Sequence, residues 1–453
     1  MVWSIFTSQP NTQLYFSPLP SLVRVKGGHS TNGMIGNDEP ESEISLREFV
    51  ITRCPSLSQG YMGPPWWLDN GHLQTLYSAL GNFDHLDEIV YERRFLRLPD
   101  GGTLGLDFAG PQKISNDITI VLMLHGISGG SNEAYVRSVL RHVCAPKYEG
   151  GLGYRGVVMN FRGCGNVPLT SPQLYSAGYT DDLRATILYL RKKYPKAKIL
   201  GIGFSLGANV LTRYLGEEGY NSQLVSGCAL ACPWDLLRFS DHIESSWFHR
   251  NIYSRALAQS IQAKVKENLN IMRQECSQDV LLHIDTLLKA KNPQVILVDE
   301  HVTRFLGGSS TPFPLASAKD YYRWASCIDQ VSNIRVPFLA INALDDPISS
   351  TVPVPLPEEA AHTILATTAN GGHLGWFEGG GVGWWETKRW IKNPIVEWVR
   401  ATGEELVSQT LPDVAVMIKD GFTCLESKPE VGFKEIILEM VPITKDDLLP
   451  LSI

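Results

Sequence analysis

The 453-residue sequence has no excess of basic residues and no long apolar run. Its 40 lysines and arginines are outnumbered by 47 aspartates and glutamates, and no basic cluster is interleaved with aromatic residues. A polyanion-binding face is therefore not expected, and nucleic acid is excluded as a predicted partner. No apolar run approaches the roughly 18 to 20 residues that span a bilayer, so no transmembrane segment is predicted.

Paired cysteines and an export signal are also missing. The eight cysteines are scattered, with no C-x-x-C pair and no metal-ligand spacing, so we predict mostly buried, reduced thiols and neither metal nor cofactor. The first 20 residues contain no basic segment followed by an apolar stretch, and the chain has no N-x-Ser/Thr acceptor site. These features predict a cytoplasmic protein and leave open contact with the surface of a membrane or lipid droplet.

What is present divides the chain into a core and three additions. Residues 1–60 are rich in Ser, Pro, Gly and Asn, which predicts a loosely ordered N-terminal arm. Residues 61–233 and 331–400 are predicted to form the core, and residues 234–330 a helical cap inserted into it. A longer crossover between two strands is the alternative for this insertion. Residues 401–453 form a C-terminal extension in which we find no evident chemistry.

The core is predicted from short apolar runs that end in Gly, Pro or a polar residue. These runs lie at 117–126, 155–163, 197–205, 224–233 and 336–347. Runs without polar alternation are typical of strands buried on both faces, and segments with helical spacing separate the earlier ones. An alternating stretch at 88–110, with Asp-Gly-Gly in its centre, predicts a β-hairpin. We therefore expect an α/β fold with a mostly parallel central sheet flanked by helices.

Ser205 lies in the segment KILGIGFSLGANVLTRYL, at an abrupt junction between a predicted strand and a predicted helix. Gly203 and Gly207 flank it in the pattern G-x-S-x-G. Such a turn is so tight that side chains at both flanking positions would clash, and it presents the serine hydroxyl as a nucleophile. The alternative, a glycine-rich turn without chemistry, does not account for the strand before it and the helix after it.

A serine hydroxyl needs a base to take its proton and a carboxylate to orient that base. In this type of fold the chain order is serine, acid, histidine. Asp346 follows the last clear strand and is the predicted acid, with Asp345 as the competitor. His373 lies in the glycine-bounded stretch NGGHLGW and is the predicted base.

The developing oxyanion needs hydrogen-bond donors. The stretch LHGISGG ends the first buried strand, and we predict the oxyanion hole from the backbone amides of Ile127 and Leu206. His125 is then a loop-structuring residue and not the base. A glycine-rich phosphate cradle is the rival interpretation of this loop, but no Lys-Ser/Thr follows it.

Several blocks taken together resemble one family. In chain order they are PPWWLDNGHLQTL, LHGISGGSNEAYVR, NFRGCGNVPLTSPQLYSAGYTDDLR, GIGFSLGANVLTRYLGEEG, INALDDPI and GGHLGW. This set resembles the AB hydrolase 4 family of α/β-hydrolases over roughly residues 60 to 400. The resemblance implies the α/β-hydrolase fold and carries the family's catalytic positions to Ser205, Asp346 and His373. The AB hydrolase 4 family includes esterases of short and medium acyl chains, phospholipases and medium-chain fatty-acid ethyl ester synthases.

Some residues of these blocks have no derived chemistry. The NGHLQT block has no role that we can derive, and His72 within it either lines the site or is structural. Asn160 and Arg162 are better explained as loop-fixing polar residues than as catalysts. Six aromatic residues of the insertion either favour an acyl chain or form the core of the cap. These residues are Trp234, Trp247, Phe248, Tyr321, Tyr322 and Trp324.

The expected function is a serine carboxylic-ester hydrolase acting on short- to medium-chain acyl esters through an acyl-serine. Its expected partner is a small acyl ester, or an acyl-CoA with an alcohol. An acyl-CoA:alcohol O-acyltransferase would use the same three residues, because water exclusion and alcohol binding decide the outcome. A phospholipase or monoacylglycerol lipase is a further alternative, and a non-catalytic hydrolase-like binding protein is the remote one.

Overall fold

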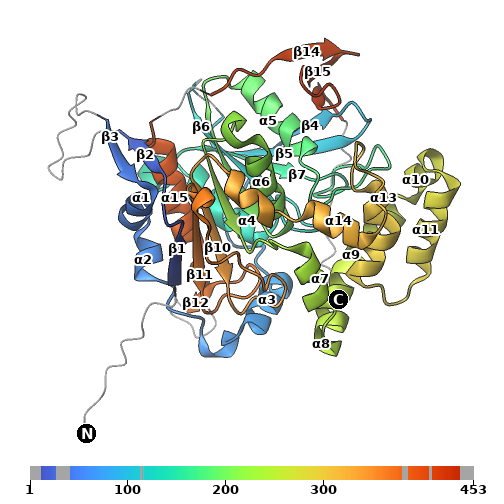
Figure 1. Cartoon of the computed structure of the whole chain (residues 1–453), viewed down its shortest axis with the longest axis horizontal. Coiled ribbons are helices and arrows are strands. Elements are labelled where there is room, and N and C mark those ends of the chain that lie inside the picture. Colours follow the sequence, from blue (N-terminus) through green and yellow to red (C-terminus); the bar gives the residue numbers. More distant parts are fainter. Residues whose placement is uncertain are drawn as a thin grey trace, which may run out of the picture.

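The computed structural model describes residues 12–26, 41–112, 115, 117–379, 386–407 and 411–438. A twelve-stranded sheet crosses the molecule in the order β1-β11-β10-β9-β8-β6-β7-β5-β4-β16-β15-β14 (Figure 1). Its parallel centre consists of β6 (Thr119–Leu124), β7 (Arg155–Asn160), β8 (Lys198–Phe204), β9 (Ser226–Leu230), β10 (Phe338–Ala343) and β11 (Thr363–Thr368). These strands coincide with the apolar runs, because each is buried on both faces.

Antiparallel strands extend the sheet on both sides. The predicted hairpin is β4 (Glu92–Arg97) with β5 (Thr103–Ala109), and β5 pairs with β7. Beyond β4 lie β16 (Gly432–Ile436), β15 (Phe422–Leu425) and β14 (Val416–Lys419), and β1 (Thr12–Phe16) forms the opposite edge. A separate hairpin pairs β12 (Phe377–Gly379) with β13 (Thr387–Arg389).

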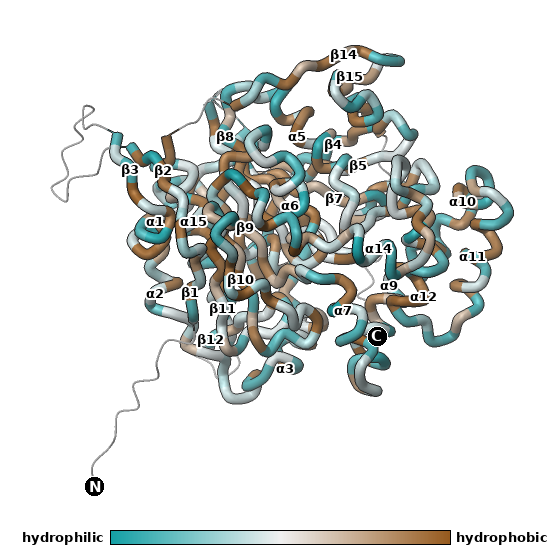
Figure 2. The backbone as a smooth tube through the Cα atoms, in the orientation of Figure 1, coloured by the Kyte–Doolittle hydropathy of each residue, from teal (hydrophilic) through white to brown (hydrophobic). Residues whose placement is uncertain are grey.

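Helices cover both faces of the sheet. Alternate residues of β6 enter two different apolar clusters. The sheet face that carries Ile120 packs against α5 (Asp181–Lys193) and α6 (Leu206–Glu218). The opposite face, which carries Val121, packs against α4 (Ala134–Cys144) and α15 (Lys392–Glu404). Figure 2 shows apolar residues gathered along the central strands between these layers. The predicted α/β fold is thereby confirmed.

The expectation of a loosely ordered arm at 1–60 is wrong where the structure describes it, at 12–26 and 41–60. The ordered elements are β1, β2 (Leu22–Val25), β3 (Ser42–Ser45), α1 (Leu46–Arg53) and α2 (Pro55–Gln59). β1 pairs with β11, and α1 buries Phe49 edge-on against Trp398 of α15. Composition hid this order, because Leu46, Phe49 and Val50 recur at helical spacing within a polar segment.

The predicted boundary at 400 falls inside α15, which runs from Lys392 to Glu404. After α15, the predicted extension contributes β14, β15 and β16 to the central sheet, where Lys434 of β16 pairs with Arg97 of β4. The described part of the extension is therefore continuous with the core. Residues 439–453 lie outside the described residues.

The insertion between β9 and β10 is helical in the structure. Its helices are α7 (Leu236–Ile243), α8 (Trp247–His249), a π-turn (Arg250–Ser254), α9 (Arg255–Glu267), α10 (Leu269–Glu275), α11 (Gln278–Lys289), α12 (Val295–Val298), a π-turn (Asp299–Thr303), α13 (Arg304–Leu306) and α14 (Ala318–Ala325). Helices α9 to α13 share an apolar cluster of their own and lie to one side of the sheet (Figure 1).

Shorter helices complete the fold around the strand ends. The helix α3 (Gly71–Leu80) follows a 3-10 turn (Trp66–Leu68), and further 3-10 turns lie at Lys147–Glu149, Gly219–Asn221, Ile328–Asn333 and Glu358–Ala360. No helix in the described ranges combines the length and apolar character needed to cross a bilayer. Seven of the eight cysteines are buried, Cys276 is half-buried, and all eight are unbridged.

Candidate active site

Ser205 occupies the sharp turn between β8 and α6 with backbone angles φ 52° and ψ −117°. This conformation is costly for a residue with a side chain and persists only where its surroundings force it. Both flanking glycines are required by close packing. A Cβ at Gly203 would lie 2.4 Å from the carbonyl oxygen of Gly207, and one at Gly207 would lie 2.4 Å from the carbonyl oxygen of Leu124. Ser205 therefore lies in a tight strand-to-helix turn between two glycines that leave no room for side chains.

A hydrogen-bonded chain joins the three predicted catalytic side chains. His373 Nε2 lies 2.7 Å from Ser205 Oγ, and His373 Nδ1 lies 2.8 Å from Asp346 Oδ2. The other carboxylate oxygen, Asp346 Oδ1, accepts from the amides of Ile348 and Ser349 at 2.8 and 2.9 Å. Asp346 is 3% exposed, so these contacts hold its carboxylate in one orientation.

Asp345, the competing acid, lies outside this chain. Its Oδ1 accepts from the backbone amide of Gly372 at 2.9 Å, and its Oδ2 lies 3.4 Å from Asn370 Nδ2. Burial raises the pKa of this carboxyl group. Asp345 therefore supports the loop that carries His373 and does not contact the imidazole.

The predicted oxyanion loop lies beside the nucleophile. A Cβ at Gly126 would lie 3.5 Å from Ser205 Cβ. Within the described ranges, the amides of Ile127 and Leu206 donate to no other protein group. Leu206 is the first residue of α6, where the helix dipole favours negative charge. The structure thus brings both amides to the neighbourhood of Ser205, as available donors.

His125 is a structural residue. It is fully buried, its Nδ1 lies 2.7 Å from the carbonyl oxygen of Gly126, and its Nε2 accepts from the amide of Phe161 at 3.2 Å. Burial lowers its pKa to about 4, so the ring is neutral at physiological pH. Both nitrogens are occupied, and His125 joins two loops at the strand ends.

The NGHLQT block, for which the sequence offered no role, supports the loop that carries His373. Asn70 caps α3 by accepting from the amide of Leu73 at 3.0 Å. Thr75 Oγ1 accepts from the amide of His373 at 2.8 Å, and Gln74 Oε1 accepts from the amide of Phe377 at 3.0 Å. These partners lie about 300 residues further along the chain, so no local pattern could have identified them.

His72 connects α3 to the cap. Its Nδ1 lies 2.8 Å from the hydroxyl of Tyr253, and its ring contacts Phe248 edge-on at 5.1 Å between centroids. Asn160 and Arg162 fix loops, as expected. Asn160 Oδ1 accepts from the amide of Ser131 at 2.9 Å, and Arg162 binds Asp182 through two hydrogen bonds of 2.8 and 2.7 Å.

Most of the six aromatic residues of the insertion belong to the packed interior. Trp234 is fully buried and donates to Asn342 Oδ1 at 3.0 Å, and Tyr321 and Tyr322 are also buried. Trp324 packs against Phe313. By contrast, Trp247 is 75% exposed and Phe248 is 41% exposed. The buried residues of this set therefore belong to the core of the cap, which was the second of the two alternatives. The six aromatic residues together do not form one acyl-chain pocket.

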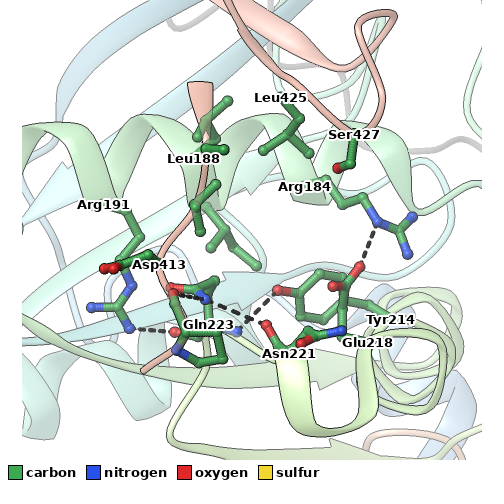
Figure 3. A pocket seen from close by; sticks show the side chains of 14 residues that line it. Arg184, Leu188, Arg191, Tyr214, Glu218, Asn221, Gln223, Asp413, Leu425 and Ser427 are labelled. Atoms are coloured by element: carbon green, nitrogen blue, oxygen red, sulfur yellow. Dashed lines mark hydrogen bonds and ion pairs between the residues drawn. The ribbon is translucent and has the colours of Figure 1, made fainter. Parts of the chain in front are cut away.

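A pocket of about 300 Å³ lies elsewhere, between α5, α6 and the C-terminal segment 412–427 (Figure 3). Tyr214, Leu188 and Leu425 form part of its wall, and Arg184 pairs with Glu218 at one side. None of its lining residues belongs to the predicted catalytic set. Among the described residues, no group of three His, Cys, Asp or Glu side chains could hold a metal ion.

Comparison with known proteins adds independent findings. A family model described as alpha/beta hydrolase fold matches residues 119–379, more than half of the chain. A monoacylglycerol lipase of Saccharomyces cerevisiae is 29% identical, covering 83% of this chain and 89% of its own. Monoacylglycerol lipase ABHD2 of Danio rerio is 30% identical, covering 79% of this chain and 82% of its own.

A solved structure with 18% identity is also similar to this chain. The Pyrococcus furiosus esterase Pf2001 is 18% identical with a TM-score of 0.38, covering 65% of this chain and 88% of its own. The family match and the 30% identical relative are together sufficient for classification. The chain therefore belongs to the α/β-hydrolase superfamily and, within it, to the AB hydrolase 4 family.

Proposed function

We propose that the protein is a serine carboxylic-ester hydrolase that acts through an acyl-serine intermediate. The hydrogen-bonded chain from Ser205 through His373 to Asp346 is the observation that supports this proposal. In the proposed reaction His373 Nε2 takes the proton of Ser205 as Oγ attacks the acyl carbonyl carbon. Asp346 holds the imidazole in the tautomer that leaves Nε2 free to accept, and it stabilises the imidazolium.

The amides of Ile127 and Leu206 are proposed to bind the oxyanion that forms on the carbonyl oxygen. Both belong to backbone beside Ser205, so they need no rearrangement when charge develops. His373 then returns its proton to the leaving alcohol. Water, activated by the same imidazole, attacks the acyl-serine and releases the acid.

For the substrate we propose a lipid ester with one acyl chain, of the monoacylglycerol class. Two curated relatives with 29% and 30% identity carry the name monoacylglycerol lipase, and each alignment covers more than three quarters of this chain. The proposal also includes short- and medium-chain esters. Acyl transfer to an alcohol remains a separate outcome that the experiment below distinguishes.

The test is hydrolysis of monoacylglycerols and of p-nitrophenyl esters from C2 to C16 by the full chain and by Ser205→Ala. We expect the variant to lose at least about 10³-fold in kcat, because the nucleophile is absent. A fluorophosphonate is expected to label the wild type and not the variant. Full activity in Ser205→Ala would overturn the assignment of Ser205 as the nucleophile. If the protein forms more ester than acid from acyl-CoA and ethanol, the proposed reaction is acyl transfer and not hydrolysis.

A further inference from the structure

Ser128, the residue after the predicted oxyanion donor Ile127, has an unusual backbone conformation. Its φ is +54°, in the left-handed region that residues with a side chain rarely adopt. A strained residue of this kind persists only when its neighbours over-determine it. The partners of Ser128 therefore fix the backbone that directly follows Ile127.

One partner is Tyr175, which belongs to a loop packed against the cap. The amide of Ser128 donates to the Tyr175 hydroxyl at 2.9 Å, and Ser128 Oγ lies 3.1 Å from the same oxygen. The preceding residue, Leu174, is buried in the apolar cluster of the cap helices, and its amide donates to the carbonyl oxygen of Leu306 in α13 at 2.7 Å. The backbone next to Tyr175 is thus bound to the cap, while the Tyr175 ring stacks on Phe161 of the core.

The second partner belongs to the cap itself. Ser260, in α9, places its Oγ 2.9 Å from Ser128 Oγ. Ser260 Oγ donates its single proton to the carbonyl oxygen of Leu257 at 2.8 Å. Toward Ser128 it can therefore only accept. Ser128 therefore donates to Ser260, and a side chain of the cap is bound directly to the oxyanion loop.

We propose that seating of the cap on the core holds the oxyanion hole in its productive geometry, with Ser260 and Tyr175 as positioning residues. Displacement of the cap removes the hydrogen bond from Ser260 and draws Leu174 and Tyr175 away from Ser128. Ser128 then relaxes from its left-handed conformation, and the amide of Ile127 turns away from the oxyanion position. This inference rests on the proposed ester hydrolysis, because it concerns the oxyanion of that reaction.

The experiment compares the full-length wild type with Ser260→Ala and Tyr175→Phe, using a water-soluble p-nitrophenyl ester and an alkyl trifluoromethyl ketone. Ser205 Oγ adds to the ketone carbon, its proton passes to His373, and the ketone oxygen becomes the oxyanion held by the loop. For each variant we expect kcat to fall about tenfold and the ketone to bind about tenfold more weakly. The KM is expected to change by less than about twofold, because the ground-state ester does not need the hole.

Two further variants serve as controls. Ser245→Ala removes an exposed cap hydroxyl that bonds only the carbonyl oxygen of His242, and it is expected to behave as the wild type. Ser260→Thr keeps the hydroxyl and is expected to restore kcat and ketone affinity. Thermal unfolding of each variant identifies loss of fold, and Ser260→Ala alone suffices if Tyr175→Phe does not fold.

Equal kcat and equal ketone affinity in wild type and in folded Ser260→Ala would overturn the coupling between cap and oxyanion loop. A loss confined to KM would also overturn it, since that result assigns Ser260 to substrate binding. A wild type that hydrolyses no ester and takes no fluorophosphonate on Ser205 would instead overturn the proposed function, so the two failures are distinguishable.

Discussion

Two buried carboxylates, Asp346 in the core and Asp299 in the cap, have different kinds of hydrogen-bond partner. Asp346 accepts from two backbone amides and lies 2.8 Å from the His373 imidazole. Asp299 accepts from the Tyr322 hydroxyl at 2.7 Å, and no cation pairs with it among the described residues. Burial raises the pKa of Asp299 to about 6.

This difference separates a carboxylate that orients an imidazole from a buried carboxyl group bound by a tyrosine hydroxyl. In the core, backbone at the ends of parallel strands positions each reactive group, so the charge of Asp346 has fixed dipoles around it. In the cap, the Tyr322 hydroxyl binds a buried carboxyl group whose pKa is raised by its burial. A hydroxyl contact also joins the cap to Ser128, because Ser260 Oγ lies 2.9 Å from Ser128 Oγ.

The largest effect is expected in the core, at Asp346. In Asp346→Asn the amide favours the imidazole tautomer with its proton on Nε2, which cannot accept from Ser205. We expect kcat to fall by about 10⁴-fold, as the corresponding substitution does in a serine-protease triad. Steady-state hydrolysis of a p-nitrophenyl ester measures the effect.

The neighbouring Asp345 provides the matched control. Asp345→Asn retains an oxygen that can accept from the amide of Gly372, so we expect a loss of less than about tenfold. Equal losses in the two variants would contradict the assignment of Asp346, and a larger loss in Asp345→Asn would make Asp345 the acid.

An intermediate effect is expected in the cap, as a pH dependence of stability. The folded pKa of Asp299, about 6, lies above the ordinary value of 3.8. Its stabilising contribution is fully present below about pH 3.8 and is lost as pH rises through about 6. In Asp299→Asn this loss does not occur. The free energy of unfolding of the variant, relative to that of wild type, should therefore rise by up to about 3 kcal/mol between pH 4 and pH 7.

Urea unfolding at several pH values measures that difference, with hydrogen exchange reporting the cap helices separately. Asp241→Asn is the control, because it removes an exposed carboxylate of the cap. A constant free-energy difference between Asp299→Asn and wild type across the range would show that Asp299 titrates normally in the folded protein.

The parallel sheet and the positions of Ser205, Asp346 and His373 could be predicted because their signals are local. A nucleophile turn needs glycines two residues on either side of the serine, and the later residues follow strand ends in a characteristic order. Buried parallel strands likewise leave continuous apolar runs. Apart from the order of the three residues, each of these patterns is complete within about ten residues.

The features that the sequence did not predict depend on residues that are far apart in the chain. β1 is a five-residue strand whose pairing partner, β11, lies some 350 residues later, so its sequence alone resembles a loop. Trp234 and Tyr322 read equally as acyl-chain contacts or as core until their burial is known. The support that Thr75 provides to His373 has the same origin, because only the folded core brings α3 to that loop.

The smallest effect is expected at Thr75, which tests whether the core depends on such distant support. Thr75→Val keeps the shape and removes the acceptor for the amide of His373, leaving that amide unpaired at a site where Thr75 is 5% exposed. An unsatisfied buried donor costs about 1 to 3 kcal/mol, and relaxation of the loop shifts the imidazole away from Ser205. We therefore expect kcat to fall about tenfold with KM unchanged. Thr75→Ser should restore the rate, whereas Thr52→Val, at an exposed helix position, should not change it. A Thr75→Val enzyme with wild-type kcat would show that Asp346 and the glycines around His373 position the imidazole without α3.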